Sequence, residues 1–214
     1  MQSGCMETNW AAENLQTIRT LMERSALYRR ALAPVMIFSG IAGIVGGGMG
    51  WGLKIESSSG FVLLWIGVAA FALAGSFFLV RRQALKDSEP FWSPPTKRVT
   101  QALAPAFLAG VIVAAPFLIF DWHDHVWIWW LPVVWTTLYG LALHSAGFFM
   151  PRGIRLFGWC FVVSGLAMFI VGTCLPRLIS PIQQAHLVMG GIFGGLHLVY
   201  SIYLYLTEKR GNES

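Results

Sequence analysis

Apolar positions in this chain are grouped in long uninterrupted blocks. Six stretches contain no Asp, Glu, Lys or Arg, and they cover residues 31–53, 60–80, 101–120, 126–150, 156–175 and 178–206. The hydrocarbon core of a bilayer is about 30 Å thick, and a helix needs about 20 apolar residues to cross it. The pattern therefore predicts an all-α, polytopic integral membrane protein with six transmembrane helices arranged as three hairpins.

The composition excludes several other classes of protein. Of the 214 residues, 56% are hydrophobic and 12% are charged, whereas soluble domains contain about 45–50% apolar and about 25% charged residues. A soluble domain of this size has too little interior to hide so much apolar surface, so the excess must face lipid. A soluble enzyme, a disulfide scaffold and a disordered chain are all excluded.

Basic residues fall almost entirely on one side of the predicted topology. Thirteen of the 15 Lys and Arg residues precede the first stretch, follow the last, or lie within 81–100 and 151–155; the other two are Lys54 and Arg177. Cytoplasmic segments carry the excess of basic residues, so both termini are expected in the cytoplasm, and the expected membrane is the plasma membrane of a bacterium. Anionic lipid headgroups account for the basic charge, and no nucleic-acid partner is expected.

The segment before the first stretch, residues 1–30, carries an amphipathic pattern. Ala11, Leu15, Ile18 and Met22 recur at spacings of four and three, and polar residues such as Gln16 occupy the other faces. This spacing predicts a cytoplasmic amphipathic helix. Two interpretations remain: the helix lies in the headgroup layer, or it forms a seam with a partner helix, from a second copy or another protein. Residues 207–214 form a short cytoplasmic tail.

An internal repeat links the first two predicted hairpins. The sequence Ala-Leu-Ala-Pro at 31–34 recurs at 102–105, and the same offset of 71 residues pairs Trp51 with Trp122 and Arg81 with Arg152. A repeat unit with two spans runs parallel to its copy, so the two units would be related about an axis along the membrane normal. The sequence thus predicts a parallel duplication.

Small residues mark the expected contacts between helices. Helices in lipid associate through close backbone packing, for which glycine is suited. The candidate packing residues share a spacing of four or seven positions along one helix; they are Gly43 and Gly47, Gly158, Gly165 and Gly172, and Gly190 and Gly194.

Two histidines lie on the small, polar faces of predicted spans. His144 shares its face with Thr137, and His197 shares its face with Ser201. Polar groups inside a membrane usually face the bundle interior and find partners there. We expect the two imidazoles to point between the fourth and sixth spans, where they form hydrogen bonds between helices, face each other as a haem site or proton relay, or line a pocket together with Thr137 and Ser201.

The loop between the third and fourth spans offers a second constellation. Carboxylate and imidazole groups follow one another there and are candidate ligands of Zn²⁺ or Cu²⁺. The candidates are Asp121, His123, Asp124 and His125, with His186 at the outer end of the sixth span completing the set. The alternative interpretation is a tight polar turn within a belt of tryptophans.

These features favour a non-enzymatic membrane protein that assembles with itself or a partner at the cytoplasmic face. No acidic residue lies inside a span, so a carboxylate coupling site is missing. One alternative is a small-molecule permease or channel with a polar pocket between helices 4 and 6. A second is a haem- or metal-binding redox protein, which rests on the five histidines. The favoured interpretation requires no cofactor.

Overall fold

The computed structural model describes residues 31–88, 91–120, 125–150, 153–174 and 180–212. This part of the chain is helical and contains no strand. In chain order its elements are a first helix Ala31–Gly52, α2 Ser58–Lys86, α3 Pro94–Ile119, a 3₁₀ helix His125–Trp129, α4 Trp130–Ala146, α5 Gly153–Cys174, α6 Pro181–Met189, a π-helix Gly190–Gly194 and α7 Gly195–Asn212. The predicted amphipathic helix within 1–30 lies outside the described residues.

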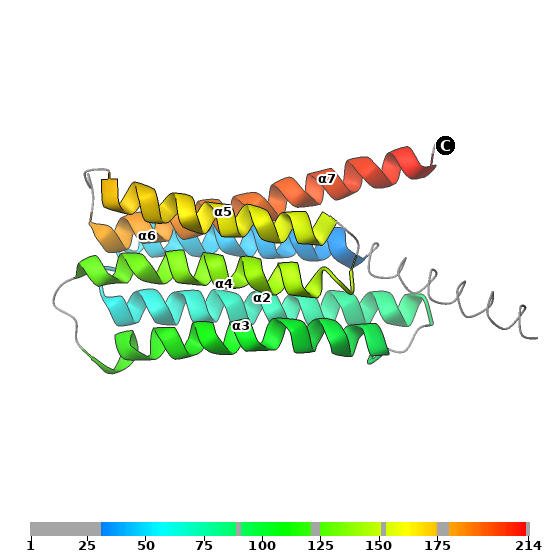
Figure 1. Ribbon diagram of the computed structural model, residues 1–214, viewed down its shortest axis with the longest axis horizontal. Coiled ribbons are helices and arrows are strands. Elements are labelled where there is room, and N and C mark those ends of the chain that lie inside the picture. The colour runs from blue at the N-terminus through cyan, green and yellow to red at the C-terminus, as the bar shows by residue number, and fades with distance from the viewer. Residues whose placement is uncertain (1–30, 89–90, 121–124, 151–152, 175–179, 213–214) are drawn as a thin grey trace, which may run out of the picture.

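Several helices have the length and composition of membrane spans. Among the described residues, five are long and apolar enough to cross a bilayer: Ala31–Gly52, Ser58–Lys86, Thr96–Ile119, Gly153–Gly172 and Pro181–Thr207. The prediction of an all-helical protein with apolar helices of membrane-spanning length is therefore confirmed. The helices lie side by side along the long axis of the molecule, and α7 diverges from the others toward its C-terminal end (Figure 1).

The remaining predicted stretch, 126–150, is divided between two elements. The 3₁₀ helix precedes α4, which has 17 residues. Pro132 lies in the first turn of α4, where its missing N–H has no helical partner to lose, so α4 begins around this proline and the chain before it adopts the tighter winding. Other boundaries also differ: α2 continues past residue 80 through Arg81 and Arg82 to Lys86.

The last predicted span is one helical rod with a change of winding inside it. α6 passes into the π-helix and then into α7 without a break. Four of the six residues at 190–195 are glycine. Glycine has no side chain that could hinder the wider winding of a π-helix. A π-turn takes one more residue per turn than an α-turn, and such turns often mark functional positions.

The core consists of two clusters, one toward each end of the bundle. The first holds Phe61 and Trp65 of α2 with Leu131 of α4 and Met189 of α6. The second gathers Met36, Leu143, Phe157, Phe161 and Tyr200 from the first helix, α4, α5 and α7. Each cluster therefore ties at least three helices together.

The glycines predicted to pack helices lie at close helix contacts. A Cβ on Gly43 would stand 2.8 Å from the amide nitrogen of Gly194, and one on Gly47 would stand 2.8 Å from the Cα of Gly190. On α5, a Cβ on Gly158 would come within 2.7 Å of the carbonyl oxygen of Gly140 in α4. The remaining two glycines of α5 face side chains: Gly165 faces Thr137, and Gly172 faces Trp129.

We predict that Gly194→Leu destabilises the protein, because its Cβ would meet the backbone nitrogen of Ile44 at 2.7 Å and the carbonyl oxygen of Gly40 at 2.8 Å. Overpacking of this kind costs about 1–3 kcal/mol of unfolding free energy. The matched control is Gly191→Leu in the same π-helix, whose Cβ would meet nothing within 4 Å. Thermal unfolding in detergent gives the melting temperature of each variant. Equal melting temperatures for Gly194→Leu and Gly191→Leu would contradict this close packing at Gly194.

Candidate functional site

His186 is a fully buried histidine on α6, and both of its ring nitrogens are engaged. The indole Nε1 of Trp65 donates a hydrogen bond to Nδ1 over 3.2 Å, and Nε2 lies 3.3 Å from the carbonyl oxygen of Ile55. Because an indole N–H only donates and a carbonyl only accepts, the ring carries its proton on Nε2 and is neutral. Phe61 packs against the ring at 4.8 Å, and the backbone of Gly50 lies directly over it.

His197 is the second buried histidine of the same rod, on α7. Its Nδ1 lies 2.6 Å from the carbonyl oxygen of Phe193, one turn earlier, and its Nε2 lies 2.8 Å from the hydroxyl of Tyr139 on α4. The carbonyl only accepts, so Nδ1 carries the proton and the tyrosine hydroxyl donates to Nε2. Phe157 and Phe161 of α5 surround the ring at 5.3 and 5.4 Å.

The π-helix explains why the two histidines meet different neighbours. They are eleven residues apart, close to a whole number of turns of a regular α-helix, so a regular helix would place them on one face. The π-turn accommodates one additional residue and shifts every later position by about 100° relative to a regular α-helix. His186 consequently faces α2, whereas His197 faces α4 and α5.

The sequence-predicted pocket residues do not form a common site. The ring of His144 packs against Phe148 of the following turn and Trp159 of α5 at 5.6 Å each, and its buried Nδ1 has no hydrogen-bond partner among the described residues. Thr137 donates to the carbonyl oxygen of Val133 within its own helix. Ser201 likewise donates to the carbonyl oxygen of Leu198.

The expectation that His144 and His197 face each other is corrected by helical phase. Tyr139 and His144 are five residues apart on α4, which corresponds to an angle of about 140° around the helix axis. Because Tyr139 contacts His197, the ring of His144 points to a different face, toward α5. The partner of His197 is thus a phenol, and the structure does not bring together the two imidazoles that a bis-histidine haem site would use.

The predicted metal site is largely outside the described residues. Asp121, His123 and Asp124 are not described, nor is the side chain of His125. His186, the fifth candidate, has both nitrogens engaged by Trp65 and Ile55. Within the part of the chain that the structure describes, no group of three or more His, Cys, Asp or Glu residues could hold a metal ion.

Two residues of the site, Tyr139 and Trp65, were not singled out by sequence reasoning. Both are aromatic residues inside apolar stretches, where they look like ordinary core residues. Their polar atoms could have indicated them, because a buried Tyr hydroxyl or Trp N–H usually has a hydrogen-bond partner. A buried histidine can be that partner.

The arrangement limits the chemistry that either histidine can perform. A proton relay requires each group to accept a proton on one side and release it on the other. The Nδ1–H of His197 ends at the carbonyl of Phe193, and the Nε2–H of His186 ends at the carbonyl of Ile55. A backbone carbonyl has no proton to pass on, so each chain of hydrogen bonds terminates inside the protein.

Comparison of the chain with known protein families, characterised proteins and solved structures finds no match.

We predict that Tyr139→Phe lowers the free energy of unfolding by about 1 kcal/mol, because it removes the hydroxyl and leaves Nε2 of His197 buried without a donor. The control is Tyr203→Phe on α7, since the Tyr203 side chain is 54% exposed. Chemical or thermal unfolding in detergent measures both variants. If Tyr139→Phe unfolds like the parent, the hydrogen bond contributes nothing to stability.

Proposed function

We propose that this chain is a non-enzymatic integral membrane protein that assembles with itself or with a partner protein through its cytoplasmic face. The observation that carries the proposal is the termination of both histidine hydrogen-bond chains at backbone carbonyls. Ionisable residues inside a membrane are functional candidates by default, but here His186 and His197 serve to join helices. The activity is therefore assigned to the outer surface of the bundle and its cytoplasmic segments.

Six spans, arranged as three hairpins, are the topology that we propose. The length of α4 together with its preceding 3₁₀ helix supports the sixth span. Seventeen α-helical residues extend about 25 Å, and five 3₁₀ residues add about 10 Å, so the segment His125–Ala146 matches a hydrocarbon core of about 30 Å. The duplication of the first two hairpins rests on the 71-residue offset.

The described basic side chains support a cytoplasmic location for both termini, in a bacterial plasma membrane. Six of them gather at the end of the bundle where α2 ends and α3 and α5 begin: Arg81, Arg82, Lys86, Lys97, Arg98 and Arg155. Two stack on aromatic rings there, Arg98 on Phe149 at 5.9 Å and Arg155 on Phe148 at 5.3 Å. Lys54 lies at the opposite end, in the turn between the first helix and the start of α2.

The topology predicts where an impermeant thiol reagent reacts in intact cells. In a background that lacks Cys5, Cys160 and Cys174, we expect Ser59→Cys to be labelled from outside and Ser88→Cys to be labelled only after permeabilisation. Both positions are exposed turn or helix-end residues, so accessibility to water alone does not separate them. The reverse labelling pattern would invert the proposed orientation.

Assembly through the segment 1–30 is tested by photo-crosslinking in cells. A photoreactive residue at Leu15, on the predicted apolar face, is expected to give an adduct, either of twice the chain's mass or with a partner protein. The same residue at Gln16, on a predicted polar face, is the matched control and is expected to give at most a weak adduct. No adduct at Leu15, or equal adducts at both positions, would overturn assembly through this face.

A second candidate function is a small-molecule permease with a route between α4 and the α6–α7 rod. The π-helix favours it, because π-turns often mark functional positions and this one lies within the rod. A transport route would need water near the buried face of α7, where Ser201 is 5% exposed. In the same cysteine-free background, Ser201→Cys would then react with a small aqueous thiol reagent. A cysteine there that stays unreactive removes the permease alternative, whereas reaction would make it the leading function.

A further inference from the structure

Tyr200 of α7 has a buried hydroxyl that forms no hydrogen bond with the described residues. The side chain is 8% exposed, and its ring stacks on Phe157 of α5 at 4.3 Å between the ring centroids. The ring is therefore held in place while its polar atom is left without a partner. Buried tyrosine hydroxyls usually have a partner, so an unpartnered one requires an explanation, such as a ligand that the protein binds.

The hydroxyl lies at the first residue of α5. A Cβ on Gly153 would stand 2.7 Å from the hydroxyl oxygen and 3.6 Å from the Cζ of the same ring. Because Cα–Cβ bonds tilt toward the N-terminus of a helix, this oxygen lies on the N-terminal side of the first turn. Gly153 is partly exposed, so the hydroxyl is buried beside a helix end that solvent reaches.

The N-terminus of α5 offers hydrogen-bond donors and positive charge. The first amides of a helix have no partner within the helix, and the helix dipole places a partial positive charge on them. α5 has 22 residues and no acidic residue in its first turn. The serines before α2 and α6 accept from the first-turn amides of those helices. In contrast, Arg152 precedes Gly153 in the sequence, and a guanidinium has donors only, so its side chain cannot cap the amides of α5.

The charge around this helix end favours an anion. Arg155 lies in the first turn of α5, and its guanidinium stacks on the exposed ring of Phe148 at 5.3 Å. It is one of the six described basic side chains at this end of the bundle. Asp87 is the acidic residue whose side chain the structure describes here, and its carboxylate accepts a hydrogen bond from Gln83. A surplus of positive charge raises the local concentration of anions.

The donors at this helix end approach from two directions. The amides of α5 point along the helix axis, whereas the Tyr200 hydroxyl lies beside the first turn. A phosphate group has several strong acceptor oxygens and can accept from both directions at once. Helix N-termini bind phosphate groups through their free amides and dipole. The arrangement therefore matches a phosphate group.

We propose that the N-terminus of α5 and the hydroxyl of Tyr200 form a binding site for one phosphate group. The phosphate accepts from the first-turn amides and from the hydroxyl, and Arg155 adds positive charge in the same turn. The phosphate belongs to a lipid headgroup or to a small soluble phosphate ester, which share this chemistry. The site goes beyond the proposed function, since it requires neither assembly nor a partner protein.

Tyr200→Phe removes the hydroxyl and keeps the ring that stacks on Phe157. The matched control is Tyr205→Phe, also on α7, because the Tyr205 side chain is 67% exposed. In the absence of phosphate, we expect Tyr200→Phe to melt no lower than the parent, because the hydroxyl gives up no hydrogen bond within the described part of the protein. The variant thus tests the site without disturbing the fold.

Gly153→Ala serves as a second variant. Its Cβ would meet the hydroxyl oxygen at 2.7 Å and displace it, whereas after Tyr200→Phe the nearest ring atom is 3.6 Å away, an ordinary contact. We therefore expect Gly153→Ala alone to weaken phosphate binding. Added to Tyr200→Phe, it is expected to cause no further loss.

Isothermal titration calorimetry on the detergent-purified full chain measures binding of two probes that carry the same phosphate monoester. Glycerol 3-phosphate is the soluble probe, and phosphatidic acid in micelles is the lipid probe. The parent and Tyr205→Phe are expected to bind one phosphate per chain with equal affinity. Tyr200→Phe is expected to bind about tenfold more weakly, because a hydrogen bond to a charged group is lost. Binding of phosphatidic acid alone identifies a lipid headgroup as the ligand, and binding of glycerol 3-phosphate identifies a soluble ester.

Three results would overturn the proposal. The first is a parent protein that binds neither probe at one per chain, and the second is equal affinity of the parent and Tyr200→Phe. The third is a lower melting temperature of Tyr200→Phe without phosphate, which would show that the hydroxyl has a partner inside the protein. The Leu15 crosslink does not involve this site, so the assembly proposal and the phosphate proposal fail separately.

Discussion

The constraint on which this structure depends is the absence of water from the bilayer core. A polar side chain that enters hydrocarbon is stabilised by partners inside the protein, and the sequence places two histidines in one helical rod. Each is satisfied by a side chain from another helix and by a backbone carbonyl, of Ile55 for His186 and of Phe193 for His197. The tryptophan and the tyrosine that complete these bonds fix which helices are neighbours.

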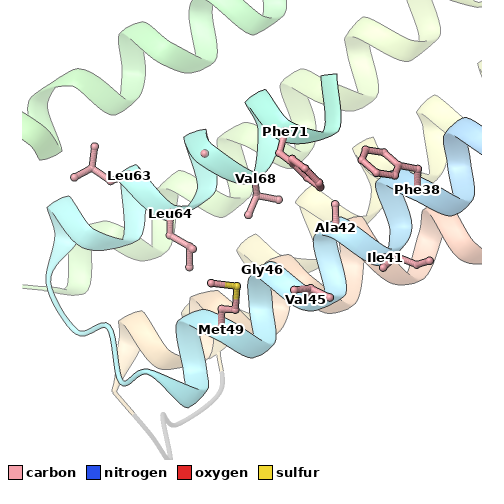
Figure 2. A pocket seen from close by; sticks show the side chains of 11 residues that line it. Phe38, Ile41, Ala42, Val45, Gly46, Met49, Leu63, Leu64, Val68 and Phe71 are labelled. Atoms are coloured by element: carbon pink, nitrogen blue, oxygen red, sulfur yellow. The ribbon is translucent and has the colours of Figure 1, made fainter. Parts of the chain in front are cut away.

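Close backbone packing is the second condition, because apolar burial gives no preference for protein over lipid. The first helix lies against the π-helix through Gly43 and Gly47, and α4 lies against α5 through Gly140 and Gly158. α2 also approaches the first helix at a glycine, since a Cβ on Gly46 would stand 2.7 Å from the side chain of Val68 (Figure 2). Glycine therefore lies at each of these close approaches between helices.

The sequence predicts where the helices lie along the chain, but it does not predict how each helix is rotated about its own axis. Charge-free length identifies five of the membrane-length helices directly, because the bilayer imposes length and composition on every span. Contacts between histidines depend on rotation about each helix axis. Tyr139 and His144 point in different directions around the axis of α4. The spacing of His186, Gly190, Gly194 and His197 fits a regular α-helix, so the sequence does not reveal the rotation that the π-turn adds before His197. The pocket candidates share this limit, because their spacing along the chain does not fix the rotation of each helix about its axis.

The π-helix has a consequence for the way this chain tolerates changes in length. Removing one residue between Gly190 and Gly194 would restore α-helical winding and rotate α7 so that His197 no longer met Tyr139. α6 would keep its place, with His186 still bonded to Trp65. The additional residue in the π-helix thus determines how α7 is rotated relative to α6. The buried hydrophobic residues of α6 belong to the first core cluster and those of α7 to the second. A single-codon deletion there changes which side chains the second cluster receives, whereas the buried residues that α6 gives to the first cluster, Ile182, Ala185 and Met189, all precede it.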